Sequence, residues 1–421
     1  MKKNKINNDS RLDLIIFLIH LLILDLSLKR WNAGIPVQFI DEVFDHGSEF
    51  FYGLKPQAPT LILLPVLYSL KNKSVYLEGT KVGSVKDLFV IEKPEEYLPG
   101  KGKFIFSDRY SVFDWGEMPD HILEKGRALC IMGAYFFEKL ESLGVKTHYL
   151  GLVEDNKVKN LSELNKPSNE MMVKILRVKK PEVVGSSYDY TSFYEANKRN
   201  VVVPLEIIYR NYLPEGSSVF SRMKRGELKP EDLGLTELPP PGSKLDKPLL
   251  DVSTKFEATD RYINWEEAAT IAALEEEEME EINKTTLYVN NIINQAVANV
   301  GLVNEDGKVE YGFDENGNII LVDILGTPDE CRFTYQGLNV SKEVTRNYYR
   351  RTSWFDEVEK AKKKDRLNWK ESVKTPPPTL PPELVKLVSQ MYQSCCNAVT
   401  GYKWFDVPQL NTILSHLQQY L

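Results

Sequence analysis

The sequence predicts an α/β protein of the α+β type, in which antiparallel hairpins and helices occupy different stretches of the chain. Two observations support this fold class. Short runs of β-type residues come in pairs joined by turns that contain Gly, and longer apolar patterns between them repeat every three to four residues. The chain has 421 residues, of which 42% are hydrophobic and 27% are charged, so it can bury a large core. At about 150 residues per domain, this length corresponds to about three domains or two large ones.

Charge and cysteine content disfavour several classes of protein. Lys and Arg total 53 against 60 Asp and Glu, a net charge of −7, whereas nucleic-acid binders usually carry a basic stripe. We therefore expect no nucleic-acid partner. The 4 Cys form no C-x-x-C pair and the 5 His form no H-E-x-x-H pattern, which disfavours a disulfide framework and a zinc site. A reducing cytoplasm is the expected location.

Residues 1–73 differ in character from the rest of the chain. They hold two apolar runs, Leu12–Leu28 and Thr60–Leu70. The first is interrupted by aspartates and the second by Pro65, and both are shorter than the roughly 20 apolar residues of a membrane-spanning helix. A membrane attachment is therefore disfavoured, and a buried or interfacial helix is the alternative. We expect residues 1–73 to be dispensable, and a start codon assigned too far upstream would explain them.

The remaining elements follow from local patterns. Glu78–Gly83 is a predicted hairpin turn, Gly144 is a predicted helix stop, and Asn264 is a predicted N-cap with acidic residues in the turn that follows it. Predicted strands cover Ser74–Leu77, Val85–Glu92, Lys103–Phe106, Met171–Val178, Val201–Tyr209, Val309–Phe313 and Ile319–Asp323. Predicted helices cover Lys125–Leu143, Trp265 to about Val300, Val340–Lys364 and Pro382–Gly401. Glu237–Lys247 is a predicted loop, and the acidic run Glu275–Glu278 is a predicted solvated helix face.

Two segments of the first half concentrate polar groups. In the hairpin turn, Gly83 lets backbone N–H groups approach a ligand, and Lys81 and Lys86 can reach phosphate oxygens. An ordinary hairpin turn is the alternative. The loop after the third strand, Ser107–Asp114, packs carboxylates, a guanidinium and hydroxyls together, which suits a polar zwitterionic substrate. An internally hydrogen-bonded loop is the alternative there.

Two segments of the second half add further candidates. Arg210 ends a strand before a Gly turn, where a guanidinium can grip a phosphate. Lys308 and Glu310 share one face of their strand because side chains alternate, and Asp323 on the partner strand can meet Glu310. Two converging carboxylates suit a Mg²⁺ that also binds ATP phosphates, and a structural salt-bridge cluster is the alternative.

The order and content of these four segments resemble the SAICAR synthetase family of purine biosynthesis (phosphoribosylaminoimidazole-succinocarboxamide synthase). The similarity covers about Ser74 to Tyr402 and is strongest at FSDRYSVFD, VVVPLEIIYRNYLPEGS, STKFEATD, DGKVEYG and LVDILGTPDECRF. The last two are similar to the family's D-x-K-x-E-[FY]-G strand and its D-E-x-x-[ST]-P-D-x-x-R segment.

The resemblance implies a two-lobed fold, with a small antiparallel β-rich lobe at residues 74–200, a larger α+β lobe at residues 201–421, and ATP in the cleft between them. It implies an ATP-dependent ligase that joins L-aspartate to 5-amino-1-(5-phosphoribosyl)imidazole-4-carboxylate and releases ADP and phosphate. ATP and Mg²⁺ are the implied cofactors, and these small molecules are the implied partners. A homo-oligomer is left open.

The resemblance also implies roles for individual residues. Lys81 and Lys86 would hold ATP phosphates, with Glu206 near the nucleotide at the hinge between the lobes. Glu310 and Asp323 would bind Mg²⁺. Lys308, Lys255 and Asp329 would be catalytic, with Lys308 facing the reacting carboxylate or phosphate. Asp108, Arg109, Ser111, Arg210, Ser217, Asp260 and Arg332 would bind the substrate, with Arg210, Ser217 and Arg332 on its ribose 5-phosphate.

Five positions depart from the family pattern. Ser84 stands where the family often has Lys, Thr259 where it has His, and Ile324 where it has a second acid. Glu330 and Cys331 replace the usual small hydroxyl residues. These departures motivate an alternative, a nucleotide-binding regulatory module with the same fold and no ligase activity.

Overall fold

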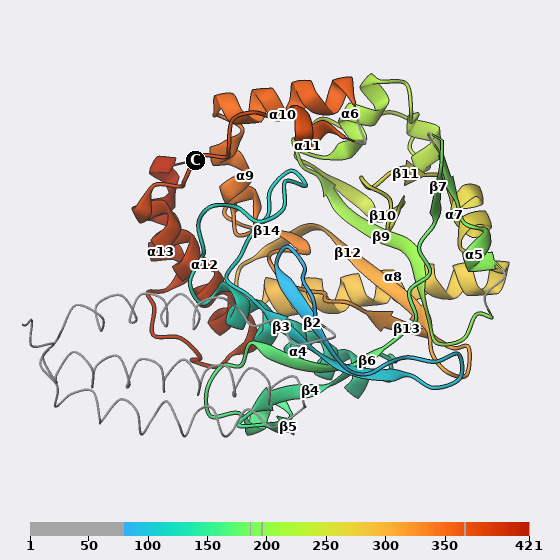
Figure 1. The fold of residues 1–421 in the computed structure, drawn as a ribbon. Helices are drawn as coiled ribbons and strands as arrows, with labels where there is room; N and C mark the ends of the chain where they lie inside the picture. Colours follow the sequence, from blue (N-terminus) through green and yellow to red (C-terminus); the bar gives the residue numbers. More distant parts are fainter. Residues whose placement is uncertain (1–79, 186, 195–196, 366–367, 421) are drawn as a thin grey trace, which may run out of the picture. The chain divides into compact units, whose positions relative to one another are not determined.

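The computed structural model describes residues 80–420 except 186, 195, 196, 366 and 367 (Figure 1). Spatial proximity divides the chain into two units, Met1–Val75 and Tyr76–Leu421, and every described residue belongs to the second. The strand expected at Ser74–Leu77 and the two apolar runs lie outside the described residues. No helix in the described part of the chain combines the length and the hydropathy needed to cross a membrane.

An antiparallel six-stranded sheet in the order β1-β2-β3-β6-β4-β5 occupies the first half of the described chain. Its strands are β1 (Thr80–Lys81), β2 (Lys86–Glu92), β3 (Gly100–Phe106), β4 (Tyr149–Glu154), β5 (Lys157–Lys159) and β6 (Glu170–Ile175). The predicted helix is confirmed as α4 (Lys125–Ser142), which packs against β3, β4 and β6. Gly133 of α4 makes room for Ile324, because a Cβ there would lie 1.9 Å from Cδ1 of Ile324.

A seven-stranded sheet follows, in the order β11-β10-β9-β12-β14-β15 with β13 paired to β12. Its strands are β9 (Val201–Leu213), β10 (Ser243–Thr254), β11 (Tyr262–Ile263), β12 (Val303–Phe313), β13 (Ile319–Val322), β14 (Cys331–Tyr335) and β15 (Leu338–Asn339). Helix α8 (Glu276–Ala298) packs against β9, β12 and β13 (Figure 1). Pro204 is tolerated inside β9 because the register with β12 shifts between Val202 and Glu206.

The prediction of one helix from Trp265 to Val300 is wrong, because the structure divides it. Asn264 caps α7 (Trp265–Ile271) as predicted, accepting the N–H of Glu267 at 2.7 Å. The chain then turns at Ala273, whose φ is 48°, and Glu278 accepts the N–H of Glu275 at 2.8 Å to begin α8. The acidic run therefore lies at the start of α8, where the helix dipole favours negative charge.

The predicted helix Val340–Lys364 is also divided. It forms α9 (Glu343–Tyr349) and α10 (Ser353–Lys364), and Thr352 caps the second by accepting the N–H of Phe355. The loop predicted at Glu237–Lys247 ends earlier than expected, because β10 already begins at Ser243.

The C-terminal helix prediction is confirmed. α12 (Pro382–Thr400) ends at Gly401, whose φ is 75°, and it packs against α4 and α13 (Leu410–Leu417) (Figure 1). The remaining elements are β7 (Glu182–Val184), β8 (Ser187–Asp189), α5 (Thr191–Tyr194), α6 (Ser218–Lys224), α11 (Trp369–Ser372) and the 3₁₀ turns Leu161–Glu163, Pro230–Leu233 and Gln418–Tyr420.

The two large sheets meet at isolated backbone bridges. Thr147 pairs with Leu321 and Arg177 pairs with Val201, both in parallel orientation. One continuous core of buried apolar side chains extends across both sheets and the helices that cover them. The α+β fold class is therefore confirmed, while the lobe boundary at residue 200 stays a prediction.

Candidate functional site

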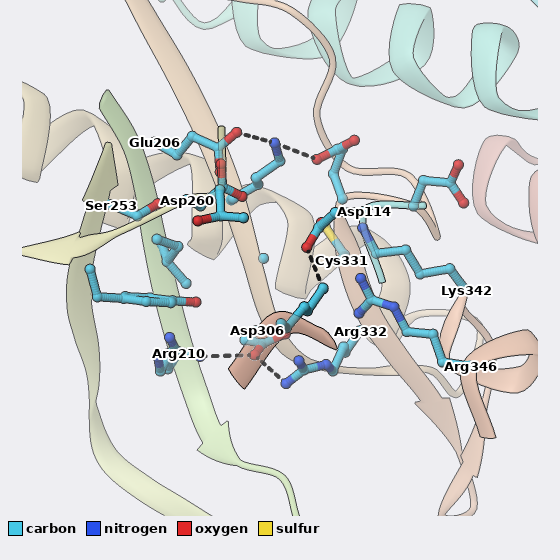
Figure 2. A pocket seen from close by; sticks show the side chains of 18 of the residues that line it. Asp114, Glu206, Arg210, Ser253, Asp260, Asp306, Cys331, Arg332, Lys342 and Arg346 are labelled. Carbon is cyan, nitrogen blue, oxygen red and sulfur yellow. Dashed lines mark hydrogen bonds and ion pairs between the residues drawn. The ribbon is translucent and has the colours of Figure 1, made fainter. Parts of the chain in front are cut away.

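The second sheet carries a pocket of about 610 Å³ (Figure 2). Side chains from β9, β10, β12 and β14 line it, together with side chains from α9 and α10. Alternate residues of a strand face one side of the sheet, so residues separated by two positions converge on it. The predicted site residues that line the pocket are Glu206, Arg210, Asp260, Lys308, Asp329 and Arg332.

Six charged side chains form an acid–lysine cluster that shares Glu206 and Lys308 with the pocket. Its members are Lys86, Glu206, Lys255, Lys308, Glu310 and Asp323. Lys308 Nζ lies 2.6 Å from Glu206 and 3.2 Å from Glu310. Lys255 Nζ lies 2.5 Å from Glu310, and Lys86 Nζ lies 3.0 Å from Asp323. Strand register explains part of this arrangement, because Glu310 of β12 stands directly opposite Glu206 of β9.

The two predicted metal ligands differ in proton affinity. Burial and the negative charge of Asp323 raise the pKa of Glu310 to about 7. Burial alone would also raise the pKa of Asp323, but Lys86, Lys255 and Lys308 outweigh it and hold that pKa well below its ordinary value. Glu310 therefore binds a proton more readily than Asp323 does.

The carboxylates of Glu310 and Asp323 suit a Mg²⁺ ion that takes its other ligands from water and phosphate. They suit a metal site built from protein ligands alone less well. Among the described residues, no three His, Cys, Asp or Glu side chains are grouped to hold a metal ion. Mg²⁺ is commonly bound through one or two carboxylates, with water and substrate phosphates as its other ligands. The negative charge of Asp323 contributes to the raised pKa of Glu310, and a divalent cation near both carboxylates would offset that repulsion.

Arg210 lies in the buried wall of the pocket, and its guanidinium is paired with carboxylates. It is 2% exposed, and its guanidinium lies 2.9 Å from Asp251 and 3.3 Å from Asp306. The same Asp306 oxygen lies 2.8 Å from Arg332, whose side chain is 20% exposed (Figure 2). Ser217 caps α6 and accepts a hydrogen bond from Arg210 at 3.4 Å. The phosphate-binding role of Arg210 and Ser217 stays a prediction, and Arg332 is the better exposed cation.

Lys342 and Arg346 are two of five pocket cations that were not singled out as site residues from the sequence, the others being Arg225, Lys362 and Lys363. Lys342, which precedes α9, and Arg346 on α9 line the pocket across from Arg210 (Figure 2). Glu343 holds Arg346 at 2.6 Å, and burial together with the charge of Arg346 lowers the pKa of Lys342. The start of α9 beside the pocket was not recognised, because the sequence predicted one continuous helix over Val340–Lys364. The i,i+4 spacing of the two cations was the available signal.

Two polar side chains of the predicted substrate loop after β3 accept hydrogen bonds from backbone N–H groups. Asp108 accepts the N–H of Gly126 at 3.0 Å, at the start of α4. Ser111 accepts the N–H of Gly116 at 3.3 Å. Both partners lie outside Ser107–Asp114, so these contacts fix the segment against neighbouring backbone, and Asp114 is the residue of the segment that lines the pocket. The substrate roles of Asp108 and Ser111 stay predictions.

Arg109 contacts the predicted phosphate turn instead of the pocket. Its Nη2 lies 2.5 Å from Asp87 and donates to the carbonyl of Gly83 at 3.1 Å. Asp87 also accepts the N–H of Gly83 at 3.2 Å, so that N–H already has a protein partner. A Cβ at Gly83 would lie 2.3 Å from the Lys86 carbonyl, so this turn needs glycine for close backbone packing. Arg109 therefore supports the turn that carries Lys86.

Asp329 differs from the other candidates in its surroundings. Asp329 lines the pocket, but its carboxylate lies 2.6 Å from buried Lys125 and accepts a hydrogen bond from Tyr392 at 2.6 Å. Such contacts fix its position on the pocket wall, and its catalytic role stays a prediction.

Two further candidates are more exposed. Lys81 is exposed on β1. Asp260 lines the pocket, and desolvation together with the charge of Glu206 raises its pKa to about 6.

Comparison with known proteins identifies relatives of this chain. The family model for SAICAR synthetase matches residues 80–366. A protein of Archaeoglobus fulgidus assigned the name phosphoribosylaminoimidazole-succinocarboxamide synthase is 51% identical over 340 residues, which cover 81% of this chain and 100% of its own length. The Thermoplasma acidophilum protein of that name is 32% identical over 311 residues, which cover 72% of this chain and 93% of its own.

A solved structure supports the fold. The SAICAR synthase of Saccharomyces cerevisiae, crystallised with SAICAR, aligns with a TM-score of 0.54 and 21% identity, covering 80% of this chain and 98% of its own. The chain belongs to the SAICAR synthetase family, which confirms the resemblance seen in its motifs and the implied enzyme class, an ATP-dependent ligase of purine biosynthesis.

Proposed function

We propose that the chain joins the amino group of L-aspartate to the carboxylate of 5-amino-1-(5-phosphoribosyl)imidazole-4-carboxylate, with conversion of ATP to ADP and phosphate. The observation that carries this proposal is the contact between the acid–lysine cluster and a pocket lined by several cations. Lys308 belongs to both, with its Nζ 2.6 Å from Glu206. A nucleotide phosphate and a substrate carboxylate both need such positive charge.

The cluster is the proposed site of ATP and Mg²⁺. Lys86 would contact ATP phosphates, and Asp323 and Glu310 would hold the metal ion. When bound, Mg²⁺ neutralises negative charge on the phosphate oxygens. The three lysines of the cluster keep Asp323 ionised in the absence of metal. Lys86 is a better candidate than Lys81 for contact with the ATP phosphates, since Lys86 lies 3.0 Å from Asp323 while Lys81 is exposed on β1.

The pocket is the proposed site of the two acidic substrates. Arg332, Lys342 and Arg346 line it, and Glu343 holds both arginines with distances of 3.7 Å and 2.6 Å. We infer that these cations bind the ribose 5-phosphate and the carboxylates of aspartate. Planar guanidinium groups suit both anions because they donate two parallel hydrogen bonds.

The chemistry requires charge stabilisation more than a strong base. A carboxylate is a poor acyl donor, so its oxygen would attack the γ-phosphorus of ATP and release ADP. The aspartate amine would then attack the acyl carbon and displace phosphate, losing a proton. Lys308 is the proposed group that faces the reacting carboxylate or phosphate, with its charge kept by Glu206, Glu310 and Glu330.

A coupled assay of ADP release tests the proposal. We expect release to require both the imidazole carboxylate and L-aspartate, and Glu310→Gln to abolish it. ADP release that does not depend on aspartate would contradict the ligase assignment and favour the regulatory alternative. The cytoplasmic location also stays a proposal, supported by four buried cysteines that form no disulfide.

A further inference from the structure

His148 connects the junction of the two sheets to the acid–lysine cluster. Its imidazole Nε2 lies 3.0 Å from the backbone carbonyl oxygen of Asp323, and the residue is 3% exposed. The ring stands between Phe104 and Phe137, with centroid distances of 5.7 Å and 5.5 Å. A carbonyl oxygen only accepts hydrogen bonds, so Nε2 carries the proton and donates it.

Asp323 has an uncommon backbone conformation. Its φ is 64°, in the left-handed region that residues with a Cβ rarely adopt. This turn follows the last residue of β13 and sends the Asp323 side chain to Lys86, 3.0 Å away. Strained residues of this kind persist when their surroundings hold them in place.

The residues on both sides of Asp323 are anchored. Before it, the N–H of His148 donates to the carbonyl of Leu321 at 3.0 Å. After it, Ile324 fills the space left by Gly133 of α4, where a Cβ would lie 1.9 Å from its Cδ1. Between these anchors, the carbonyl of Asp323 accepts a hydrogen bond from the His148 imidazole.

We propose that His148 is a positioning residue that holds the left-handed turn at Asp323 and thereby directs the Asp323 carboxylate toward Lys86 and the metal position. This inference rests on the proposed function of Asp323 as a Mg²⁺ ligand. Groups that orient metal ligands are frequently as important as the ligands, because they set the direction of the donor atoms.

The test measures ADP binding to the full chain by calorimetry, with and without Mg²⁺. The quantity of interest is the gain in ADP affinity that Mg²⁺ produces. His148→Phe keeps an aromatic ring between Phe104 and Phe137 but has no donor, and we expect it to reduce the gain about tenfold. His148→Gln offers an amide N–H of similar reach and should restore most of the gain. His148→Asn has the same amide on a shorter side chain and should behave as His148→Phe does.

A matched control separates positioning from loss of stability. Tyr149→Phe removes a buried hydroxyl that donates to Glu138 at 2.8 Å, in the same core but without contact to Asp323. We expect Tyr149→Phe to lower the melting temperature and leave the Mg²⁺-dependent gain unchanged. If His148→Phe does not fold, the comparison of His148→Gln with His148→Asn decides the question, because the two amides differ only in reach.

Asp323→Asn, measured in parallel, distinguishes the two proposals. If Asp323→Asn keeps the Mg²⁺-dependent gain, the metal role of Asp323 is wrong, and the inference about His148 is wrong with it. If Asp323→Asn loses the gain while His148→Phe and His148→Asn retain it, only the positioning role of His148 is overturned. A loss in His148→Gln as large as in His148→Phe would also overturn the hydrogen-bond role.

Discussion

Lys86 and Asp323 form an ion pair of 3.0 Å that joins the start of β2 in the first sheet to the residue after β13 in the second. We expect Lys86→Gln to raise the KM for ATP by about tenfold, because a charge-assisted contact to phosphate is lost. The KM for aspartate should change little. Lys81→Gln is the matched control, since Lys81 is exposed on the neighbouring strand β1. Equal effects of the two substitutions on the KM for ATP would contradict this assignment.

Arg109 is expected to affect nucleotide binding although it lies in the predicted substrate loop. Its contacts go to Asp87 and to the Gly83 carbonyl, in the turn that carries Lys86. Arg109→Lys keeps the charge but loses the planar fork, so we expect a higher KM for ATP and a nearly unchanged KM for the phosphorylated imidazole substrate. Steady-state kinetics with each substrate varied in turn measure this. Arg332→Ala should show the opposite pattern, and a matching pattern in both variants would argue against separate roles.

The contacts of Asp329 predict a structural role that can be measured as stability. Lys125 is 1% exposed and lies 2.6 Å from Asp329, so Lys125→Met leaves a buried carboxylate without its cation. We expect a loss of about 3–5 kcal/mol in the free energy of unfolding. Tyr392→Phe, which removes one hydrogen bond to the same carboxylate, should cost about 1.5 kcal/mol. Urea unfolding measures both, with exposed Tyr402→Phe as a control that should be nearly neutral.

The Glu343 carboxylate should make part of the free energy of unfolding depend on pH. Burial would raise its pKa, but Arg346, Arg332 and Arg350 outweigh burial and hold the pKa at about 2. A carboxyl with a lowered pKa stabilises the fold above its unfolded pKa, and this contribution is lost as pH falls toward the folded pKa. Glu343→Gln should therefore be less stable than the unchanged chain by on the order of 3 kcal/mol at pH 7.

Urea unfolding at a series of pH values checks the Glu343 prediction. The difference between the two proteins should shrink as pH falls below about 4.5 toward about 2. A difference that is constant over this range would mean that Glu343 contributes through packing and not through its charge.

The contact of Gly133 with Ile324 predicts a non-additive pair of substitutions. Gly133→Ala would place a Cβ 1.9 Å from Cδ1 of Ile324, and such overpacking costs about 1–3 kcal/mol. Ile324→Val removes that Cδ1 and should cost about 1 kcal/mol alone. We expect the double variant to be more stable than the sum of the single effects implies. Thermal unfolding of the four proteins tests this, and strict additivity would exclude the clash as the cause.

Local patterns were sufficient for much of the fold. The helical period of residues 125–143, the Gly144 stop and the Asn264 cap were recognised because each depends on neighbours a few residues away. The breaks at Ala273 and Thr352 were missed, since each continues an acceptable helical pattern and only a new cap reveals the interruption. Strands β4, β10 and β14 were missed as well, because each pairs with a strand that another element separates from it in the sequence.

The motifs by themselves determined the family and the residue types of the site, because phosphate and carboxylate chemistry requires particular side chains at particular spacings. Only the tertiary structure decided which of them meet. It brought Lys86 to Asp323 and Lys255 to Glu310, turned Arg109 toward Gly83, and placed Lys342 and Arg346 in the pocket. The reason is that strand alternation gives the face of each residue, whereas contacts between the two sheets depend on packing between segments far apart in the chain.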